Sequence, residues 1–351
     1  MSSSQWTGRR RPVDSEPSLT GFSFSESPVI CFRTFRNGDP PALADLWNRA
    51  VPEHGVVRPL SPHEFDERVF SRVPFDPEGL ILAEDEGHVV GFVHAGFGPQ
   101  SISGSSHALD RELGTIAMLA IEPGRNDPVL ESELISRAER YLEDRGAKVV
   151  YAGGQFELSS FYWGIYGGSE CAGILEAHEV FNRAVSRSGF EPVALTVLLE
   201  ADLSAPEVRD PKSMLIRRRT RFEIVEDANP ENWWQALALG STQLTRFRVL
   251  SKVDEKELAR ASTWDMSAFG RLDGKARTGL IDVEVAPEER RKGYGRFLIG
   301  EIIRHCRSQW GEVVSIQTRS TNLPALSLYE SLGFEVVDRT TLYRRPGSRR
   351  V

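Results

Sequence analysis

The sequence has little cysteine and no paired histidines. Its 351 residues include only three cysteines, Cys31, Cys171 and Cys306, which lie far apart and are odd in number. These counts argue against a disulfide framework and against a cysteine-rich zinc site. The seven histidines are scattered and form no H-x-x-x-H pair, so we expect no bound metal. A cytoplasmic protein fits this composition best.

Long apolar runs and an excess of positive charge are also missing. No apolar stretch approaches eighteen residues, which argues against a membrane-spanning helix. The first residues lack the apolar segment of a secretory signal. The formal net charge of −7 gives no general basic surface for nucleic acid. We therefore expect neither a membrane nor a nucleic acid as a partner.

The length suits two domains rather than one hydrophobic core. Residues 1–27 are rich in Ser, Arg, Pro and Glu and predict a disordered tail. A basic cluster at residues 9–11 of this tail is either solvated or contacts an acidic partner. Residues 201–213 contain two prolines and mostly polar side chains, which predicts a linker. We therefore place one domain at 28–200 and a second at 214–351.

The second domain contains the most informative stretch. Ile281, Val283 and Val285 alternate with Asp282 and Glu284, which predicts a half-buried strand at 280–285. A loop with two glycines follows, and then a helix whose apolar face recurs at helical spacing.

The glycines in this loop have a physical use. Without a Cβ atom, Gly293 and Gly295 allow backbone N–H groups to converge on an anion, and a helix N-terminus favours a phosphate there. Arg290, Arg291 and Lys292 add positive charge for a polyphosphate. The alternative is an ordinary strand–helix connection with a solvated basic rim.

A second motif follows about thirty residues later. It runs from Asn322 through Ala325, Leu328 and Tyr329 to a Leu-Gly-Phe triplet at 332–334. The order R-x-x-G-x-G and then N-x-x-A-x-x-L-Y-x-x-L-G-F resembles the GNAT family of acetyl-CoA-dependent N-acetyltransferases. The resemblance implies an α/β (α+β) fold of two tandem GNAT domains. Each would be a mixed, mostly antiparallel central sheet flanked by helices.

The resemblance also implies acetyl-CoA as co-substrate. We expect the coenzyme to contact the glycine loop and its neighbours: Val283, Val285, Arg290, Arg291, Lys292, Gly293, Tyr294, Gly295, Arg296, Asn322 and Ala325. The acceptor would be a small-molecule amine or a peptide amine, and the protein a monomer or homodimer.

Transfer of an acetyl group to an amine requires a base. An amine with a pKa near 10.4 is only about 0.04% neutral at pH 7, so a general base helps. Asp282 and Glu284 are our candidates, although both could be ordinary outward-facing strand carboxylates. By resemblance, Tyr329 is the acid that hydrogen-bonds the departing sulfur, and the alternative is a buried structural tyrosine. Thr318 and His305 have no assigned role.

The first domain repeats this outline without the phosphate loop. With Pro123 aligned on Pro287, Val129 replaces Gly293 and Glu131 replaces Gly295. A β-branched side chain and a negative charge both oppose phosphate binding there. Val185 stands where the second domain has Tyr329. We predict that this domain does not bind coenzyme A.

About twenty residues are inserted in the first domain, around an aromatic group. The group comprises Phe161, Tyr162, Trp163 and Tyr166 and precedes a Gly-Gly-Ser-Glu loop at 167–170. It either forms a wall of the substrate site or an interface between the halves, or packs in the local core.

The remaining expected elements follow from periodicity and turn residues. In the first domain we expect strands at 30–35, 80–83, 89–97, 115–122 and 149–152, and helices at 41–50, 63–70 and 131–144. In the second domain we expect strands at 215–222 and 264–269, a helix capped by Asn229 with Pro230 at its first position, and a helix at 254–262.

Two classes of function fit these residues. The favoured one is an N-acetyltransferase that is active in its C-terminal domain. The alternative is a non-catalytic acyl-CoA-binding sensor or protein-interaction module. Such a module would keep Gly293 and Gly295 but would have no need for Tyr329.

Overall fold

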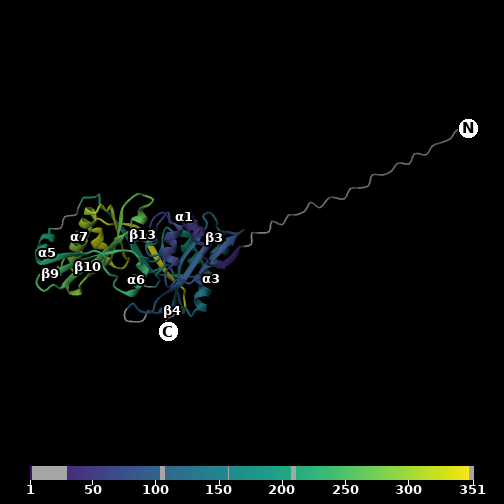
Figure 1. Ribbon diagram of the computed structural model, residues 1–351, viewed down its shortest axis with the longest axis horizontal. Helices are drawn as coiled ribbons and strands as arrows, with labels where there is room; N and C mark the ends of the chain where they lie inside the picture. The colour runs from purple at the N-terminus through teal and green to yellow at the C-terminus, as the bar shows by residue number, and fades with distance from the viewer. Residues whose placement is uncertain (2–29, 103–106, 157, 207–210, 348–351) are drawn as a thin grey trace.

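A single mixed sheet of thirteen strands runs through the computed structural model (Figure 1). The structure describes residues 1, 30–102, 107–156, 158–206 and 211–347. The tail predicted at 1–27, apart from Met1, lies outside the described residues. Twelve strands follow the order β1-β2-β3-β4-β5-β13-β7-β12-β11-β10-β9-β8, and β6 pairs with β13 beside them. The N-terminal and C-terminal halves lie side by side along this sheet.

The N-terminal half closely follows the predicted elements. In chain order it comprises β1 (Cys31–Thr34), α1 (Pro40–Ala50), α2 (Pro62–Phe65), the π-helical turn η1 (Asp66–Phe70), η2 (Pro77–Gly79), β2 (Leu80–Asp85), β3 (His88–Pro99), β4 (Leu109–Ile121), α3 (Pro128–Asp144), β5 (Val149–Ala152), β6 (Ile174–Leu175), α4 (Glu179–Arg187) and β7 (Glu191–Asp202). Helix α1 buries an apolar face, and Trp47 within it is fully enclosed. This half therefore has its own core.

The C-terminal half repeats this order of strands and helices with fewer helices. It comprises α5 (Ser213–Arg219), β8 (Thr220–Val225), α6 (Trp233–Leu239), β9 (Leu244–Ser251), β10 (Glu257–Asp265), η3 (Ser267–Gly270), β11 (Arg277–Val285), η4 (Pro287–Glu289), α7 (Tyr294–Ser308), β12 (Val313–Arg319), α8 (Leu323–Glu330) and β13 (Glu335–Arg344). Between α6 and β9, where the first half has α2, the described chain contains no second helix.

The two halves exchange their last strands. Strand β13, which ends the C-terminal half, pairs antiparallel with β5 of the N-terminal half, with Tyr343 opposite Ala152. Strand β7, which ends the N-terminal half, pairs antiparallel with β12. The two exchanged strands also pair with each other at the centre of the sheet. The sheet of each half is therefore completed by a strand of the other half. A domain boundary within 201–213 stays a prediction.

Strands β11 and β12 pair only at their beginnings. Their parallel register covers Arg277 to Gly279 against Val313 to Ser315, and beyond these residues the strands separate. We call the opening between residues 280–285 and 316–319 the wedge. Parallel strands normally satisfy each other's backbone groups, so the facing edges in the wedge are free to bind a ligand.

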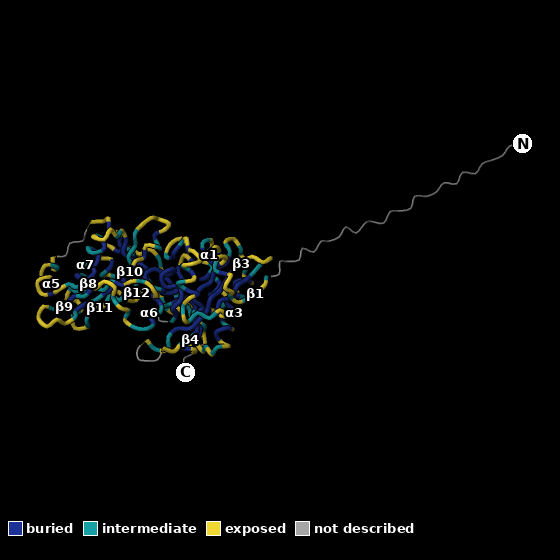
Figure 2. The backbone as a smooth tube through the Cα atoms, in the orientation of Figure 1, coloured by how far each residue is buried: buried dark blue, intermediate teal, exposed yellow. Residues whose placement is uncertain are grey.

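Helix α7 covers one face of the sheet in the C-terminal half. Its buried side chains, such as Phe297 and Ile302, form a core with Phe247 and Val249 of β9. A separate apolar cluster on the opposite face joins Trp163 of the N-terminal half to Trp264 and Ile281. Figure 2 shows buried chain running without a break from one half into the other.

Four predictions in the second half were wrong. The segment 254–262, predicted as a helix, lies mostly in β10, because pairing with β9 and β11 outweighs intrinsic propensity. Residues 215–219 form helix α5 instead of a strand, and 264–269 are the end of β10 followed by η3. The first helix is capped by Asn232 rather than Asn229. Strand β9 was not predicted.

Two further features are absent from the described residues. None of their helices has the length and hydrophobicity needed to cross a membrane. No group of three or more His, Cys, Asp or Glu side chains in this part of the chain is arranged to hold a metal ion.

Candidate active site

The glycine loop presents an uncapped helix N-terminus. Gly293 is the N-cap residue of α7 and has φ = 96°, a left-handed conformation that glycine adopts without strain. No side chain caps the helix at this position. The backbone N–H groups of the first turn are therefore available to an anion, and the helix dipole favours negative charge there.

Gly295 is needed both for the close packing of β11 against α8 and for the close approach of a ligand. A Cβ atom at this position would lie 3.3 Å from Leu328 Cδ2 and 3.4 Å from Val285 Cγ2. The glycine therefore leaves a narrow cradle between β11 and α8 that a side chain would fill. A phosphate chain of coenzyme A fits this arrangement, since it needs close contact with backbone N–H groups.

The cations around the loop are partly engaged by the protein. Arg290 Nε donates to the Val285 carbonyl at 3.2 Å, and Lys292 pairs with Glu289 at 2.9 Å. Arg296 donates to Ser331, the C-cap residue of α8, which fixes the end of α8 near the start of α7. Arg290, Arg291 and Lys292 are all exposed and so are accessible to a polyphosphate.

Helix α8 carries the predicted acid. Asn322 caps this helix by accepting from Ala325 N, and its amide donates to Thr318 Oγ1 at 3.0 Å. The cap fixes the orientation of α8 relative to β12, and this contact gives Thr318 the structural role expected of it. Tyr329 is buried within the same helix, at 5% exposure.

The surroundings of Tyr329 keep its phenol protonated. Burial, reinforced by the negative charge of Glu170, raises the pKa of Tyr329 to about 12. Tyr329 belongs to the core on the α7 face, whereas the loop that carries Glu170 lies over the opposite face, where Trp264 Nε1 donates to Ser169 O at 3.1 Å. The charge of Glu170 thus acts on Tyr329 from the opposite face of the sheet.

Asp282 lies in a bulge of β11. The register with β10 shifts between Arg260 and Ser262, and Asp282 adopts φ = 54°, which is strained for a non-glycine residue. Its carboxylate accepts a hydrogen bond from Gln235 Nε2 at 2.9 Å. Burial raises the pKa of Asp282, and the Gln235 hydrogen bond opposes this rise. A carboxyl group with a raised pKa is a stronger base than an exposed one.

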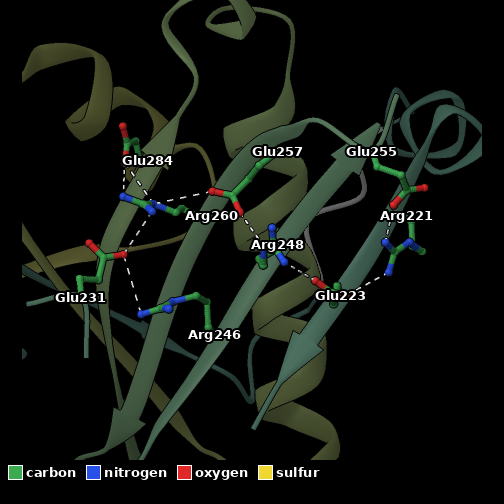
Figure 3. A network of polar contacts seen from close by, with 9 residues as sticks. All are labelled: Arg221, Glu223, Glu231, Arg246, Arg248, Glu255, Glu257, Arg260 and Glu284. Carbon is green, nitrogen blue, oxygen red and sulfur yellow. Dashed lines mark hydrogen bonds and ion pairs between the residues drawn. The ribbon is translucent and has the colours of Figure 1, made fainter. Parts of the chain in front are cut away.

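Glu284 has a different environment. It is exposed and forms an ion pair with Arg260 at 2.8 Å. Arg260 belongs to a charge ladder, a chain of alternating arginines and glutamates on the face opposite α7 (Figure 3). Its members are Arg221, Glu223, Glu231, Arg246, Arg248, Glu255, Glu257, Arg260 and Glu284. Since Glu284 is held at the end of this ladder, Asp282 is the better placed base candidate.

The corresponding helix end in the N-terminal half is occupied by the chain itself. Asp127 caps α3, and its carboxylate accepts from Val129 N and Leu130 N, both at 3.0 Å. Glu131, at 1% side-chain exposure, pairs with Arg183 at 2.6 Å and Arg187 at 3.2 Å. An internal carboxylate and a buried ion cluster therefore stand where the other half has its uncapped glycines.

The inserted aromatic segment serves both halves. Phe161, Tyr162 and Tyr166 pack in the N-terminal core, while Trp163 packs against the C-terminal half. Both readings of this segment from the sequence, core packing and an interface between halves, are therefore confirmed for different members. The loop beyond them brings Ser169 to Trp264, so the N-terminal half lies against the C-terminal wedge.

Sequence reasoning missed Gln235, which holds the Asp282 carboxylate. Its only sequence signal is its place in a short helix that begins at the tryptophan pair 233–234. The bulge that turns Asp282 toward this helix leaves no recognisable mark in a single sequence.

Three features together are typical of the GNAT acyltransferase fold. They are a glycine loop at an uncapped helix N-terminus, two parallel strands that separate, and a buried tyrosine on the next helix. Comparisons with known proteins agree. Residues 211–334 match the model of the Acetyltransferase (GNAT) family. A mycothiol acetyltransferase of Acidothermus cellulolyticus is 33% identical over 121 residues, a match that covers 33% of this chain and only 37% of that relative.

Solved structures match over most of the chain. A tandem GNAT protein from the clavulanic acid biosynthesis pathway superposes with a TM-score of 0.62 at 12% identity, covering 90% of this chain and 98% of that one. A glucosamine N-acetyltransferase region of a fungal β-N-acetylglucosaminidase gives a TM-score of 0.65 at 14% identity, covering 91% of this chain and 38% of that one. At these identities the likeness concerns the fold. Residues 211–334 therefore match the GNAT family, and the chain as a whole has the fold of tandem GNAT proteins.

Proposed function

We propose that the chain is an acetyl-CoA-dependent N-acetyltransferase whose chemistry takes place in the C-terminal half. One arrangement carries the proposal: an uncapped helix N-terminus follows β11, Asp282 with its raised pKa lies in β11 at the wedge, and the protonated Tyr329 lies on α8, the helix that follows β12. Asp127 and the Glu131 ion cluster support the prediction that the N-terminal half binds no coenzyme. A cytoplasmic location and a monomeric or homodimeric state stay predictions.

The glycine loop would hold the coenzyme. The N–H groups of the first turn of α7, together with Arg290, Arg291 and Lys292, would bind its pyrophosphate. The backbone edge of β11 around Val283 and Val285 would bind the pantetheine arm and the thioester carbonyl. The coenzyme supplies an acetyl group activated as a thioester.

Asp282 would act as the general base. A new C–N bond forms while the C–S bond breaks, the attacking nitrogen loses one proton, and the departing thiolate takes up one proton from solvent. Asp282 takes the amine proton, and Gln235 holds its carboxylate in place. Tyr329 donates a hydrogen bond to the sulfur as its negative charge develops.

The alternative is a non-catalytic acyl-CoA sensor. A sensor needs the glycine loop but has no use for a strained, half-buried carboxyl group beside the wedge. Strain of this kind costs about 1 to 3 kcal/mol and is found most often at functional sites. Asp282 therefore favours the enzyme.

The test is turnover of acetyl-CoA with a panel of primary amines, measured by mass spectrometry of the acetylated product. Loss of a general base lowers kcat by about 10²- to 10⁴-fold, and we expect this for Asp282→Asn. Glu284→Gln is the matched control and should change kcat by less than threefold. Equal losses in the two variants would overturn the assignment of the base, and failure to bind acetyl-CoA would overturn the proposed function.

A further inference from the structure

A cavity of about 470 Å³ lies between the two halves, on the face of the sheet opposite α7. Its walls include the segment 53–55 and the loop at Gly168 and Ser169 from the N-terminal half. The C-terminal half contributes Met266, Phe269 and Leu272. A cavity of this size accommodates a small organic molecule.

The cavity adjoins the closed end of the wedge. Ser315 lines it and is paired with Gly279, the last residue of β11 that pairs with β12. Side chains alternate along β12, so Val314 and Ile316 face the α7 core while Ser315 faces the cavity. A molecule in the cavity would therefore reach the wedge from the side opposite the α7 core.

Negative charge dominates the lining. Four carboxylates, from Glu53, Glu200, Asp273 and Asp338, face a single guanidinium, that of Arg277. Arg277 already pairs with Glu200 at 3.2 Å and with Asp273 at 2.6 Å. The lining thus keeps an excess of negative charge even after Arg277 has paired with two of the four carboxylates.

Two polar atoms at or beside the cavity lack a hydrogen-bond partner within the described part of the chain. Ser169 is fully buried, and its Oγ has no hydrogen bond. Gln317 Oε1 is also unpartnered, and it lies 3.2 Å from the point where a Cβ atom on Gly168 would be. Glu200 Oε1 accepts a hydrogen bond from Ser315 Oγ at 2.8 Å, and the other carboxylate oxygen, Oε2, can accept one from a ligand. Unpartnered buried polar atoms carry a desolvation cost that a donor-rich ligand removes.

We infer that this cavity binds the acceptor, and that the acceptor carries a second ammonium group besides the amine that is acetylated. This inference rests on the proposed function. The reacting amine is neutral when it attacks, so at that stage only another cationic group can balance the charge of the lining. A second ammonium group forms an ion pair with Glu200 and donates hydrogen bonds to the neighbouring acceptors. The apolar body of the molecule packs against Met266, Phe269 and Leu272. Diamines, polyamines and multiply aminated sugars belong to this class.

Binding of 1,8-diaminooctane to the full-length protein tests the inference, with 1,8-octanediol as the neutral probe of similar shape. By calorimetry without coenzyme, we expect one diamine site per chain and at least tenfold weaker binding of the diol. Glu200→Gln should remove this preference. Glu226→Gln, an exposed carboxylate far from the lining, should retain it.

A second pair of variants covers the case in which Glu200→Gln does not fold. Val337 lines the cavity and is 51% exposed, so Val337→Phe narrows the cavity without disturbing the core. It should weaken diamine binding at least tenfold, whereas Val253→Phe, at an exposed site elsewhere, should not. Equal binding of diamine and diol, or unchanged diamine binding in Val337→Phe, would overturn the inference.

Titration of acetyl-CoA into the same proteins separates the two proposals. Acetyl-CoA binding without a diamine preference would overturn only the inference about the cavity. Diamine binding without acetyl-CoA binding would overturn the proposed function and, with it, the role of the cavity as the acceptor site.

Discussion

Replacement of Tyr329 by Phe removes the proposed hydrogen bond to sulfur with little other change. Burial raises the pKa of Tyr329 to about 12, compared with about 8.5 for a free thiol. Complete proton transfer from the phenol to a thiolate would therefore cost about 5 kcal/mol, since each pKa unit is worth 1.36 kcal/mol. A hydrogen bond is the favoured interaction, and one to a charged group contributes about 1.5 to 3 kcal/mol.

This range sets the expected loss in activity. Tyr329→Phe should lower kcat by about 10- to 150-fold, because 1.4 kcal/mol corresponds to a factor of ten. The affinity for acetyl-CoA, measured by calorimetry, should stay within a factor of two. The melting temperature should change little, because no hydrogen bond to the Tyr329 hydroxyl exists among the described residues.

Tyr343→Phe is the matched control. Its hydroxyl donates to Asn182 at 3.0 Å on the N-terminal side of the sheet, so this variant should keep kcat and lose a little stability. An unchanged kcat in Tyr329→Phe would refute the assignment of Tyr329. A loss above 10⁴-fold would refute the argument that the phenol only donates a hydrogen bond.

Two further predictions concern the carboxylates of Asp282, which is half-buried, and Glu131, which is buried. Gln235→Leu removes the hydrogen bond that favours the ionised form of Asp282, so the pKa of Asp282 should rise and the acidic limb of the kcat/KM profile should move to higher pH. Arg183→Ala removes the closest partner of Glu131 and should lower the free energy of unfolding in urea by about 1 to 3 kcal/mol. Arg187→Ala should cost less, since Arg187 is more exposed.

Each of these predictions has a result that contradicts it. If the acidic limb stayed in place in Gln235→Leu, Asp282 would not be the titrating base. Gln309→Leu, an exposed substitution at the far end of α7, is the control for that profile. If the two arginine variants lost equal stability, the account of the ion cluster would be wrong.

The sequence predicted the motifs better than the layout of the second half. The loop around Gly293 and the strand before it were located correctly, because glycine positions and strict alternation are local signals. Residues 254–262 were assigned to a helix, because their propensity is helical and only the neighbouring strands β9 and β11 make them extended. The strength of a local signal thus decided which predictions succeeded.

Two features of the site depend on contacts that no local pattern records. The exchange of β7 and β13 joins residues about 140 positions apart, and it follows from the tandem arrangement rather than from either strand. The bulge at Asp282 depends on the register with β10, and it turns the side chain toward Gln235. The sequence therefore offered Asp282 and Glu284 as equal candidates, which their structural environments distinguish.

The central claim is that only the C-terminal loop binds the coenzyme. Calorimetric titration of the full-length protein with acetyl-CoA tests it most directly, together with Gly293→Glu and a matched control, Gly124→Glu. Both glycines have a left-handed backbone, with φ values of 96° and 81°, so the two substitutions impose similar strain and the same charge. We predict one site per chain, lost in Gly293→Glu and kept in Gly124→Glu. Two sites per chain, or loss of binding in Gly124→Glu alone, would contradict the claim.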